Sequence, residues 1–349
     1  MDGARLLSWG PMRSVTITDV ARGAGVSMKT VSRVLNAEPH VREEVREKVL
    51  RIARELRYRP KVSARSLAGA RSYQVGFVLS SVSPYAMHAQ LGALGACHEH
   101  GFHLVVEPID LASPELALDM EALGNSLAID GIILLPPACD SPVVLGALDE
   151  AGISYVRIAP ATARAQGASI EVDDEGAARI ITDHLLALGH RRIGMIQGPP
   201  GHAASARRLA GFRKALAAGG LEPDPALLQQ GAFLYASGLE AAERLLALPE
   251  PPTAIFASND EMALGVIAKA QSQGMNVPRD LSVAGFDDIA SASMIWPGLT
   301  TMRQPMADMA AAAAQIIIAG AGKAAPESAD VRRRFDCELV IRGSTAPPR

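Results

Sequence analysis

From residue 74 onward, short apolar runs alternate with longer segments in which apolar residues recur every three or four positions. Runs such as 74–80 and 131–135 have the length and the continuous apolar character of strands that are buried on both faces. The longer segments have the period of amphipathic helices. Strands are predicted at 74–80, 102–107, 131–135, 153–158, 192–197, near 228–233, 253–257 and 281–286. Helices are predicted at 85–100, near 114–127, near 142–151, 175–188, 204–219, 237–247 and 260–273.

This alternation predicts parallel sheets that are covered by helices on both faces. Because the pattern runs twice along the chain, we expect two similar subdomains with a cleft between them. In open parallel sheets, ligands bind beyond the carboxyl ends of the strands. Polar side chains at those ends are therefore the candidates for ligand binding.

The first 60 residues have a different pattern, with three short helical segments. Thr16 and Asp19 have the spacing of a capping box and predict a helix over about 17–23. Gly23 and Gly25 end this helix, because a tight turn needs residues that tolerate a positive φ.

A second helix is predicted over about 28–36, with Ser27 as its cap, and a third over about 43–57. Two short helices joined by a glycine turn form a helix-turn-helix, and the third helix closes its core. The residues that we expect in this core are Val31, Val34, Leu35, Val45, Val49, Ile52 and Leu56.

Charge is distributed unevenly along the chain. Residues 1–71 contain 15 Lys and Arg against 7 Asp and Glu, whereas the remaining residues contain 19 against 30. A basic head on an acidic body indicates a polyanionic partner. A solvated charged face on the third helix accounts for the composition equally well, but the helix-turn-helix pattern favours double-stranded DNA.

The second helix of a helix-turn-helix lies in the major groove, with its N-terminal side chains at the base edges. Met28, Lys29 and Arg33 are therefore predicted to contact bases, since Lys and Arg donate to guanine and Met can contact a thymine methyl group. The residues predicted to contact phosphates are Thr16, Ser27, Thr30, Ser32 and Asn36. As alternatives, Ser27 is only a helix cap and Thr30 is only a surface residue.

Residues 16–36, TITDVARGAGVSMKTVSRVLN, resemble the head signature of the lactose/galactose repressor family (LacI/GalR). Residues 58–69, YRPKVSARSLAG, resemble the hinge of that family, and the resemblance extends to about Arg342. It implies a small all-α helix-turn-helix head and an α/β body like that of periplasmic binding proteins, with two doubly wound parallel-sheet subdomains. It also implies a homodimer that binds operator DNA.

The resemblance further implies a domain organisation in which the chain crosses between the subdomains near 171, 300 and 331. The expected segments are an N-terminal extension at 1–14, a helix-turn-helix domain at 15–60, a hinge at 61–72, an effector-binding and dimerisation domain at 73–342 and a tail at 343–349. The N-subdomain is expected at about 73–171 and 302–330, and the C-subdomain at about 172–301 and 331–342.

The hinge segment is too short to form a stable helix in isolation. The resemblance implies that two hinge helices pair on DNA and that Leu67 enters the minor groove as a wedge. It places Lys61 and Arg65 near phosphates or groove edges. An ordinary flexible linker is the alternative.

Polar residues follow three of the predicted strands, namely Ser80, Asn259 and Asp287, and Arg208 lies in the helix after the GPPGH loop. A carboxylate, an amide and a guanidinium that converge on a cleft are suited to neighbouring sugar hydroxyls. Arg208 paired with an acidic neighbour is the alternative for that residue. The following Asp260 and Asp288 are predicted to be helix caps.

The resemblance implies effector contacts at Ser80, Arg208, Phe233, Asn259, Asp287 and Gln304. The ring of Tyr85 or Phe233 is suited to cover an apolar sugar face. Glu171 is a further candidate and stands where the family commonly has an aromatic ring, and Ala159 stands where some members have a carboxylate. Because of these two departures, the resemblance does not imply which sugar binds.

Other features narrow the class of protein. The cysteines Cys97, Cys139 and Cys337 are far apart, and no His or Cys residues have metal-ligand spacing. No apolar run reaches the roughly 18 residues of a membrane span, and the N-terminus lacks the pattern of a secretory signal. We therefore expect a cytoplasmic protein with no cofactor and no metal.

The expected function is a sequence-specific DNA-binding transcriptional regulator, a repressor, whose operator affinity is switched by a sugar or sugar derivative in the cleft. A sugar-binding protein of a transporter would fit the body alone but not the basic head. An enzyme would fit Asp173 and Asp174 as acid–base residues, but no nucleophile motif or phosphate loop accompanies them. No leucine heptad follows the body, so we expect a dimer, with Trp296 at its interface or packed internally.

Overall fold

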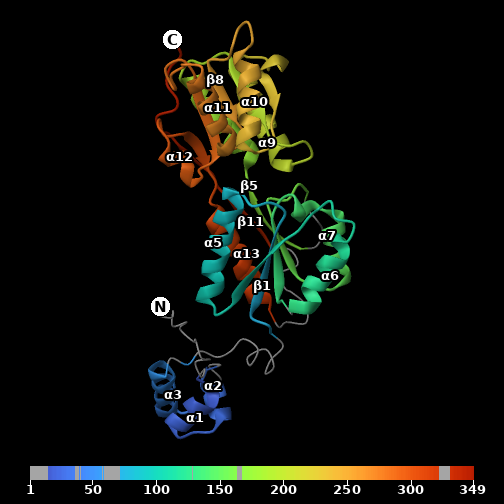
Figure 1. Cartoon of the computed structure of the whole chain (residues 1–349), viewed down its shortest axis with the longest axis vertical. Helices are drawn as coiled ribbons and strands as arrows, with labels where there is room; N and C mark the ends of the chain where they lie inside the picture. Colours follow the sequence, from blue (N-terminus) through green and yellow to red (C-terminus); the bar gives the residue numbers. More distant parts are fainter. Residues whose placement is uncertain are drawn as a thin grey trace, which may run out of the picture. The chain divides into compact units, whose positions relative to one another are not determined.

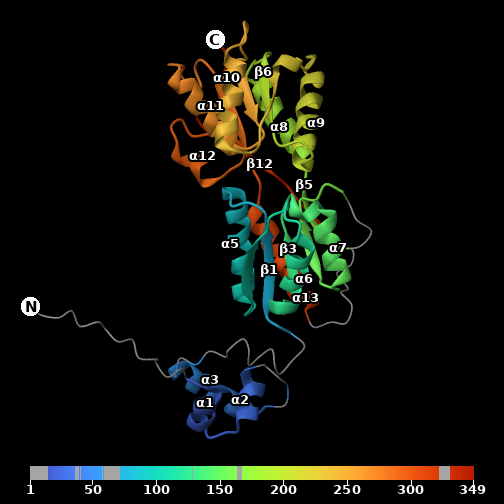
Figure 2. The same ribbon diagram turned by 45° about the vertical axis from the view of Figure 1, so that its right-hand side comes forward.

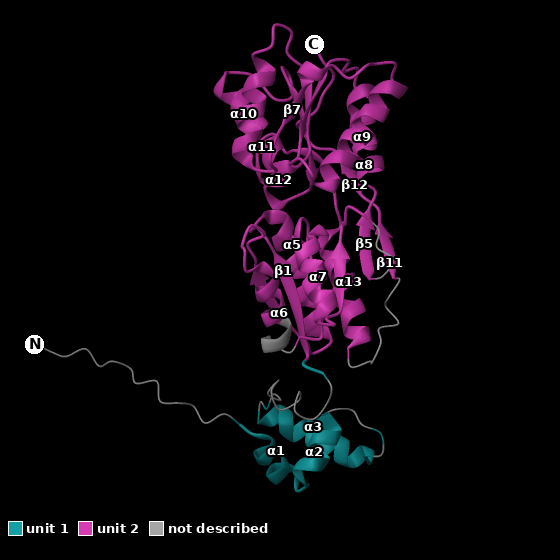
Figure 3. Ribbon diagram, turned by 90° about the vertical axis from the view of Figure 1, so that its right-hand side faces the viewer, with its two compact units in different colours: residues 1–72 teal, residues 73–349 magenta. Residues whose placement is uncertain are grey.

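The computed structural model describes residues 15–35, 39, 41–56, 58, 71–127, 129–162, 167–321 and 331–349. The chain divides into two compact units, residues 1–72 and residues 73–349 (Figure 3). Among the residues described, no helix is both long enough and apolar enough to span a membrane.

The described part of the first unit contains the helices α1 (Ile17–Ala24), α2 (Met28–Leu35) and α3 (Glu43–Glu55). The predicted capping interaction is confirmed, since both the backbone N–H and the hydroxyl of Thr16 donate to Asp19 Oδ2, at 3.0 and 2.7 Å. Gly25 ends α1 with a φ of 66°. Ser27 Oγ accepts a hydrogen bond from the Thr30 N–H at 3.1 Å and so caps α2.

The core of this unit differs from the prediction at one position. Leu56 was expected on the buried stripe of the third helix, but it follows the last residue of α3 and is 36% exposed. Tyr58 packs against the core instead. The buried core residues are Val20, Ala21, Ala24, Val31, Val34, Val49 and Ala53.

The second unit contains two six-stranded sheets (Figure 1). The first has the strand order β11-β5-β4-β3-β1-β2, with β1 (Gln74–Leu79), β2 (His103–Pro108), β3 (Gly131–Leu134), β4 (Tyr155–Ile158), β5 (Ala168–Val172) and β11 (Arg332–Phe335). The second has the order β12-β10-β9-β8-β6-β7, with β6 (Ile193–Gln197), β7 (Leu228–Gln230), β8 (Ala254–Ala257), β9 (Ser282–Asp287), β10 (Thr300–Arg303) and β12 (Glu338–Val340). All of these neighbours pair in parallel except β10 and β12. The predicted fold class is thereby confirmed.

Helices cover both faces of each sheet, as Figures 1 and 2 show. In the first subdomain they are α5 (Pro84–Glu99), α6 (Leu116–Leu127), α7 (Pro142–Glu150) and α13 (Met306–Gly320). In the second subdomain they are α8 (Asp174–Ala187), α9 (Ala203–Ala218), α10 (Tyr235–Leu246), α11 (Asp260–Ser272) and the short α12 (Ala290–Met294). The 3-10 turns η1 (Ala138–Asp140) and η2 (Pro225–Leu227) lie in connecting segments.

The strands have continuous apolar runs because helices bury both faces of each sheet. Successive side chains of a strand point to opposite faces, so each strand contributes to two cores. In β1, Phe77 packs with residues of α5 and α13, and Val78 packs with residues of α6 and α7. In β8, Ile255 and Phe256 divide in the same way between the two cores of the second subdomain. A polar residue at any of these positions would lie in an apolar core.

The apolar pattern did not predict β5, β10, β11, β12, α12 or α13. Helix α13 is almost uniformly apolar because it is buried between α5 and the sheet, and so it has no amphipathic period. Gly92 of α5 allows this close packing, since a Cβ there would overlap the backbone of Ala307. Strand β11 is an exposed edge strand with the sequence RRRF, which has no strand-like alternation.

Two expected boundaries of the C-subdomain need correction. The third crossing was placed near 331, but Arg333 of β11 pairs with Ile170 of β5 in the first sheet. The chain therefore crosses between Phe335 and Glu338, where β11 ends and β12 begins. The segment 343–349 was expected to be a tail, yet Ser344 is fully buried, accepts from the Thr300 N–H at 2.8 Å and donates to the Val283 carbonyl at 2.6 Å.

His190 also holds this C-terminal segment against the second sheet. Its ring is 1% exposed, with Nδ1 2.9 Å from Thr253 Oγ1 and Nε2 2.9 Å from the Ala346 carbonyl oxygen. The Ala346 carbonyl can only accept, so Nε2 carries the proton and Nδ1 accepts from the threonine hydroxyl. Burial lowers the pKa of His190, which favours this neutral form in the folded protein.

We predict that His190→Ala lowers the free energy of unfolding by roughly 1–3 kcal/mol at pH 7.5, because buried polar partners lose their hydrogen bonds. The folded pKa is lower than the unfolded one, so this contribution is present above the ordinary His pKa of about 6.5 and is lost as the pH falls below it. The difference between variant and wild type should therefore shrink in acid. Urea denaturation at several pH values measures it, with the exposed His98→Ala as control, and equal losses in the two variants would contradict the assignment.

Candidate functional site

The exposed face of α2 is the first candidate site. Val31 and Val34 are buried, whereas Met28, Lys29 and Arg33 are exposed on the other side of the same helix. In the described residues Lys29 has no hydrogen-bond or ion-pair partner. The structure therefore presents one apolar and two basic side chains together, as the base-contact prediction requires.

The predicted phosphate-contact residues have local partners in this unit. Thr16 bonds to Asp19, and the hydroxyls of Ser27 and Thr30 are 2.9 Å apart. Ser32 is half-buried on α2. Asn36 and the hinge residues Lys61, Arg65 and Leu67 lie outside the described residues.

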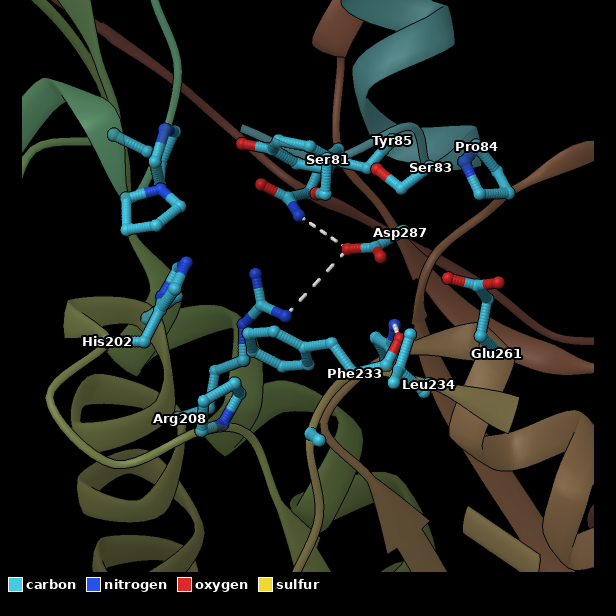
Figure 4. A pocket seen from close by; sticks show the side chains of 18 of the residues that line it. Ser81, Ser83, Pro84, Tyr85, His202, Arg208, Phe233, Leu234, Glu261 and Asp287 are labelled. Carbon is cyan, nitrogen blue, oxygen red and sulfur yellow. Dashed lines mark hydrogen bonds and ion pairs between the residues drawn. The ribbon is translucent and has the colours of Figure 1, made fainter. Parts of the chain in front are cut away.

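The second candidate site is a cavity of about 460 Å³ between the two subdomains (Figure 4). Segments of the first subdomain, including 81–85, form one wall, and segments of the second subdomain form the other. Six of the predicted effector residues line it, namely Tyr85, Arg208, Phe233, Asn259, Asp287 and Gln304. Ser80 and Glu171 do not line it: Ser81 takes the place of Ser80, and Glu171 accepts a hydrogen bond from Ser169 within β5 at 3.0 Å.

Arg208 is the most highly connected side chain of the cavity, and it is 4% exposed. Its Nε donates to Asp174 Oδ1 at 2.9 Å, and its Nη1 donates to the Ser258 carbonyl at 2.5 Å and lies 3.8 Å from Asp287 Oδ1. The guanidinium also lies 3.7 Å from the ring centroid of Phe286, within cation–π range. A buried guanidinium needs such partners because its desolvation is costly.

Asp287 ends β9 at the cavity and is 8% exposed. Its φ of 122° is rare for a residue with a side chain, and it turns the chain at the cavity wall. Gln304 Nε2 donates to Asp287 Oδ1 at 2.7 Å. Burial, together with the nearby carboxylates of Asp260 and Asp174, raises the pKa of Asp287 above its ordinary value, whereas Arg208 acts in the opposite direction.

Asn259 supports the cavity mainly by holding the neighbouring backbone in place. Its Oδ1 accepts from the Met262 N–H at 3.0 Å and caps α11, and its Nδ2 donates to the Phe233 carbonyl at 3.0 Å. Phe233 has a positive φ of 59°, and its ring forms an edge-on contact with His202 at 5.1 Å between centroids. Asn259 thus holds the loop that places the Phe233 ring on the cavity wall.

Several acidic residues have roles that differ from the sequence-based interpretation. Asp173 caps α8 by accepting from the Gly176 N–H at 2.9 Å, and Asp174 pairs with Arg208, so neither is arranged for acid–base chemistry. Asp260 is not a cap but accepts from the Ile289 N–H at 2.9 Å and the Thr301 hydroxyl at 2.5 Å. Asp288 is not a cap either, since it pairs with Arg303 at 2.8 Å and with Arg342 at 2.6 Å.

Sequence reasoning missed Asp174 and His202 as lining residues. A buried arginine requires an acidic partner, and this requirement could have directed attention to Asp174. His202 carried no comparable signal, because only its position at the start of α9 brings it to the cavity. The described residues contain no group of three or more His, Cys, Asp or Glu side chains that could hold a metal ion.

A direct contact joins the two walls of the cavity. Arg207 of α9 donates from Nη2 to the carbonyls of Pro160 and Ala161 at 3.0 and 2.8 Å. These carbonyls lie in the loop after β4, which is held by Asp140, because Asp140 accepts from the Ala161 N–H at 2.9 Å and pairs with Arg157 at 2.5 Å. The contact between the subdomains is therefore made to a loop that is itself held by hydrogen bonds to Asp140.

Known protein families match both the head and the body of the chain. Residues 16–61 match the family described as "Bacterial regulatory proteins, lacI family", and residues 182–345 match the "Periplasmic binding protein-like domain". The chain is 37% identical over 311 residues to catabolite control protein A of Priestia megaterium, covering 87% of this chain and 92% of that protein. It is 35% identical over 344 residues to the HTH-type transcriptional regulator CelR of Thermobifida fusca, covering 95% and 98%.

Two solved structures of regulatory proteins superpose on nearly the whole chain. A CelR–cellobiose complex superposes with a TM-score of 0.71 at 32% identity, covering 95% of this chain and 99% of that one. The lac repressor dimer bound to operator and the anti-inducer ONPF superposes with a TM-score of 0.77 at 28% identity, covering 96% and 100%. With a helix-turn-helix head, a two-subdomain body and relatives that match nearly its whole length, the chain belongs to the LacI family of bacterial regulatory proteins.

Proposed function

We propose that this chain is a homodimeric transcriptional repressor that binds a specific operator and changes its affinity for DNA when a sugar or sugar derivative binds in the cavity. The observation that carries the proposal is the coexistence, in one chain, of a helix-turn-helix with an exposed basic α2 face and a body with a polar cavity between two subdomains. Neither a transport protein nor an enzyme requires the first of these features.

In the head, Met28, Lys29 and Arg33 are the proposed base contacts. The proposed phosphate contacts are Thr16, Ser27, Thr30, Ser32 and Asn36, with Lys61, Arg65 and Leu67 of the hinge as the proposed minor-groove contacts. Ser27 caps α2 by accepting from the Thr30 N–H, and the proposal gives its hydroxyl a second role at a phosphate, since the start of a helix favours an anion.

In the body, the six predicted residues that line the cavity are the proposed effector contacts. A ligand shifts the DNA-binding equilibrium only through its different affinities for two body conformations. Residues on both walls supply such a difference, since Tyr85 belongs to the first subdomain and Arg208 and Asp287 to the second. Arg207 adds a contact that is made only when the two walls are close, so it contributes to the same equilibrium. The cellobiose complex of CelR supports a sugar as the ligand class.

Two exposed apolar surfaces support the homodimer. Met87, Leu91 and Leu94 lie at helical spacing on α5, with exposed fractions of 56%, 58% and 46%, and Trp296 is 89% exposed near the end of the second subdomain. The lac repressor that superposes on the chain is a dimer. Because operator DNA is the proposed partner, we place the protein in the cytoplasm.

We predict that DNA binding by the full chain depends steeply on salt. Each phosphate that Lys or Arg neutralises releases counterions, so the slope of log K against log salt concentration should be about −0.9 per phosphate contacted. Fluorescence anisotropy with an operator selected from random DNA measures this slope. A slope near zero would contradict the DNA-binding proposal.

We predict that Lys29→Ala relaxes base preference at one operator position by about 1–3 kcal/mol. The matched control is Arg51→Ala, which removes one positive charge from α3, where Arg51 pairs with Glu55 at 3.9 Å. Binding measured against single-base operator variants separates the two. If Lys29→Ala weakens binding equally on all sequences, Lys29 contacts phosphate and the base-contact proposal is wrong.

We predict that Asp287→Ala weakens effector binding by about tenfold or more, because a charge-assisted hydrogen bond contributes roughly 1.5–3 kcal/mol. Ligand-free operator binding should stay at the wild-type value. With an inducer, the variant would remain on the operator, and with a co-repressor it would bind DNA poorly under all conditions. Calorimetry with a compound found by thermal-shift screening provides the measurement, and unchanged affinity in the variant would remove Asp287 from the site.

A further inference from the structure

His202 lines the cavity and has no role in the contacts predicted above. Its ring packs edge-on against Phe233, with an interplanar angle of 88°, which fixes its orientation. Among the described residues, its buried Nδ1 has no hydrogen-bond partner. Burial and the nearby Arg208 lower the pKa of His202, so the imidazole is neutral at physiological pH.

A neutral imidazole carries one proton, and the buried Nδ1 determines where it resides. A buried N–H donor without an acceptor is costlier than a buried nitrogen lone pair without a donor. The proton is therefore more stable on Nε2 of this ring, which lines the cavity (Figure 4). His202 thus offers a neutral hydrogen-bond donor to a ligand.

The charges around this donor are largely acidic. Asp174 and Asp287 are 1% and 8% exposed, and Glu261 also lines the cavity. Arg208 is the one Arg or Lys among the described lining residues, and Asp174 and Asp287 lie 2.9 and 3.8 Å from its nitrogens. Its charge is therefore already compensated within the protein.

The buried Asp174 gives a second indication of the kind of ligand that fits. Its Oδ1 accepts from Arg208, but its Oδ2 has no hydrogen-bond partner in the part of the chain that the structure describes. A buried carboxylate oxygen without a partner is an acceptor that a donor group on a ligand, or a water molecule next to it, can satisfy. An anionic ligand group has no proton to donate and would meet like charge at the same place.

We propose that the cavity selects an uncharged polyhydroxyl ligand over its phosphorylated or carboxylated analogues, with His202 as a specificity-determining donor to a ligand hydroxyl. A hydroxyl group can accept from His202 and donate toward a carboxylate, whereas a phosphate or carboxylate only accepts. The inference rests on the proposed function, since it takes the cavity to be the effector site. It adds the charge class of the ligand and a residue that selects it.

The test uses the full chain and a panel of neutral hexoses, pentoses and disaccharides, each paired with its 6-phosphate or uronic acid where one exists. Thermal shift identifies compounds that bind, and calorimetry gives their dissociation constants. We expect a neutral compound to bind and its anionic analogue to bind at least about 100-fold more weakly, because like-charge contacts across a buried site are strongly unfavourable.

Variants then test the role of His202. His202→Ala should weaken binding of the neutral compound by roughly five- to tenfold, the effect of one lost neutral hydrogen bond. His202→Gln should recover part of this loss because its amide donates from a similar place, and the exposed His98→Ala should have no effect. Equal affinity in wild type and His202→Ala would overturn the role of His202.

The outcomes separate this inference from the proposed effector site. Tighter binding of an anionic compound, or binding by no neutral compound of the panel, would overturn the charge selection. If an anionic compound binds the wild type but not Asp287→Ala, the effector site stands and only the inference fails. A neutral compound that binds with wild-type affinity to Asp287→Ala would place the ligand elsewhere and overturn the site.

Discussion

The buried guanidinium of Arg208 is the interaction on which the cavity depends. It connects the start of α8 through Asp174, the segment after β8 through the Ser258 carbonyl, and the end of β9 through Asp287. A buried charge is stabilised by its partners, and three element ends converge on this guanidinium to supply them. The same convergence builds one wall of the cavity. Stability of the second subdomain and the chemistry of the proposed effector site therefore share one set of residues.

The connection between the subdomains follows from the sheet topology. The chain crosses between the subdomains from β5 to α8, from β10 to α13 and from β11 to β12, and the first two crossings contribute Asp174 and Gln304 to the cavity. Such segments allow the walls to approach or separate while each sheet keeps its own hydrogen bonds. The Arg207 contact with the Pro160 and Ala161 carbonyls is made across this gap. A ligand that hydrogen-bonds to both walls would stabilise the same arrangement of the subdomains as this contact does. This is the physical basis of the proposed switch.

The polar atoms of the cavity are not all satisfied by the protein. Asp174 Oδ2 and His202 Nδ1 are buried without partners among the described residues, and so is the hydroxyl of Ser258, whose carbonyl accepts from Arg208. Native interiors usually satisfy such groups, and a cluster of exceptions marks a site where a ligand or ordered water belongs. The cavity thus combines polar groups with the apolar ring of Phe233, which lies 5.9 Å from the Arg208 guanidinium, and such a mixture is typical of small-molecule sites.

The sequence by itself determined the local architecture. The Thr16–Asp19 spacing, the glycine turn and the Ser27 cap predicted the helix-turn-helix, because these are interactions between near neighbours. Alternating apolar strands and amphipathic helices predicted the two mostly parallel sheets, because burial on both faces leaves its mark within the sequence of each strand. Six of the eight predicted effector residues line the cavity. Asn259 and Asp287 follow strands whose carboxyl ends meet at one edge, whereas Gln304 was expected only from the family resemblance.

Only the tertiary structure decided the features that depend on distant segments. The edge strand β11 and the uniformly apolar α13 have no local period, and their places depend on pairing with β5 and packing against α5. Ser80 and Ser81 are adjacent in sequence, but the turn after β1 brings only Ser81 to the cavity. Asp174 became a partner of Arg208, and His202 became a lining residue, because folding brings together side chains whose proximity no local pattern encodes.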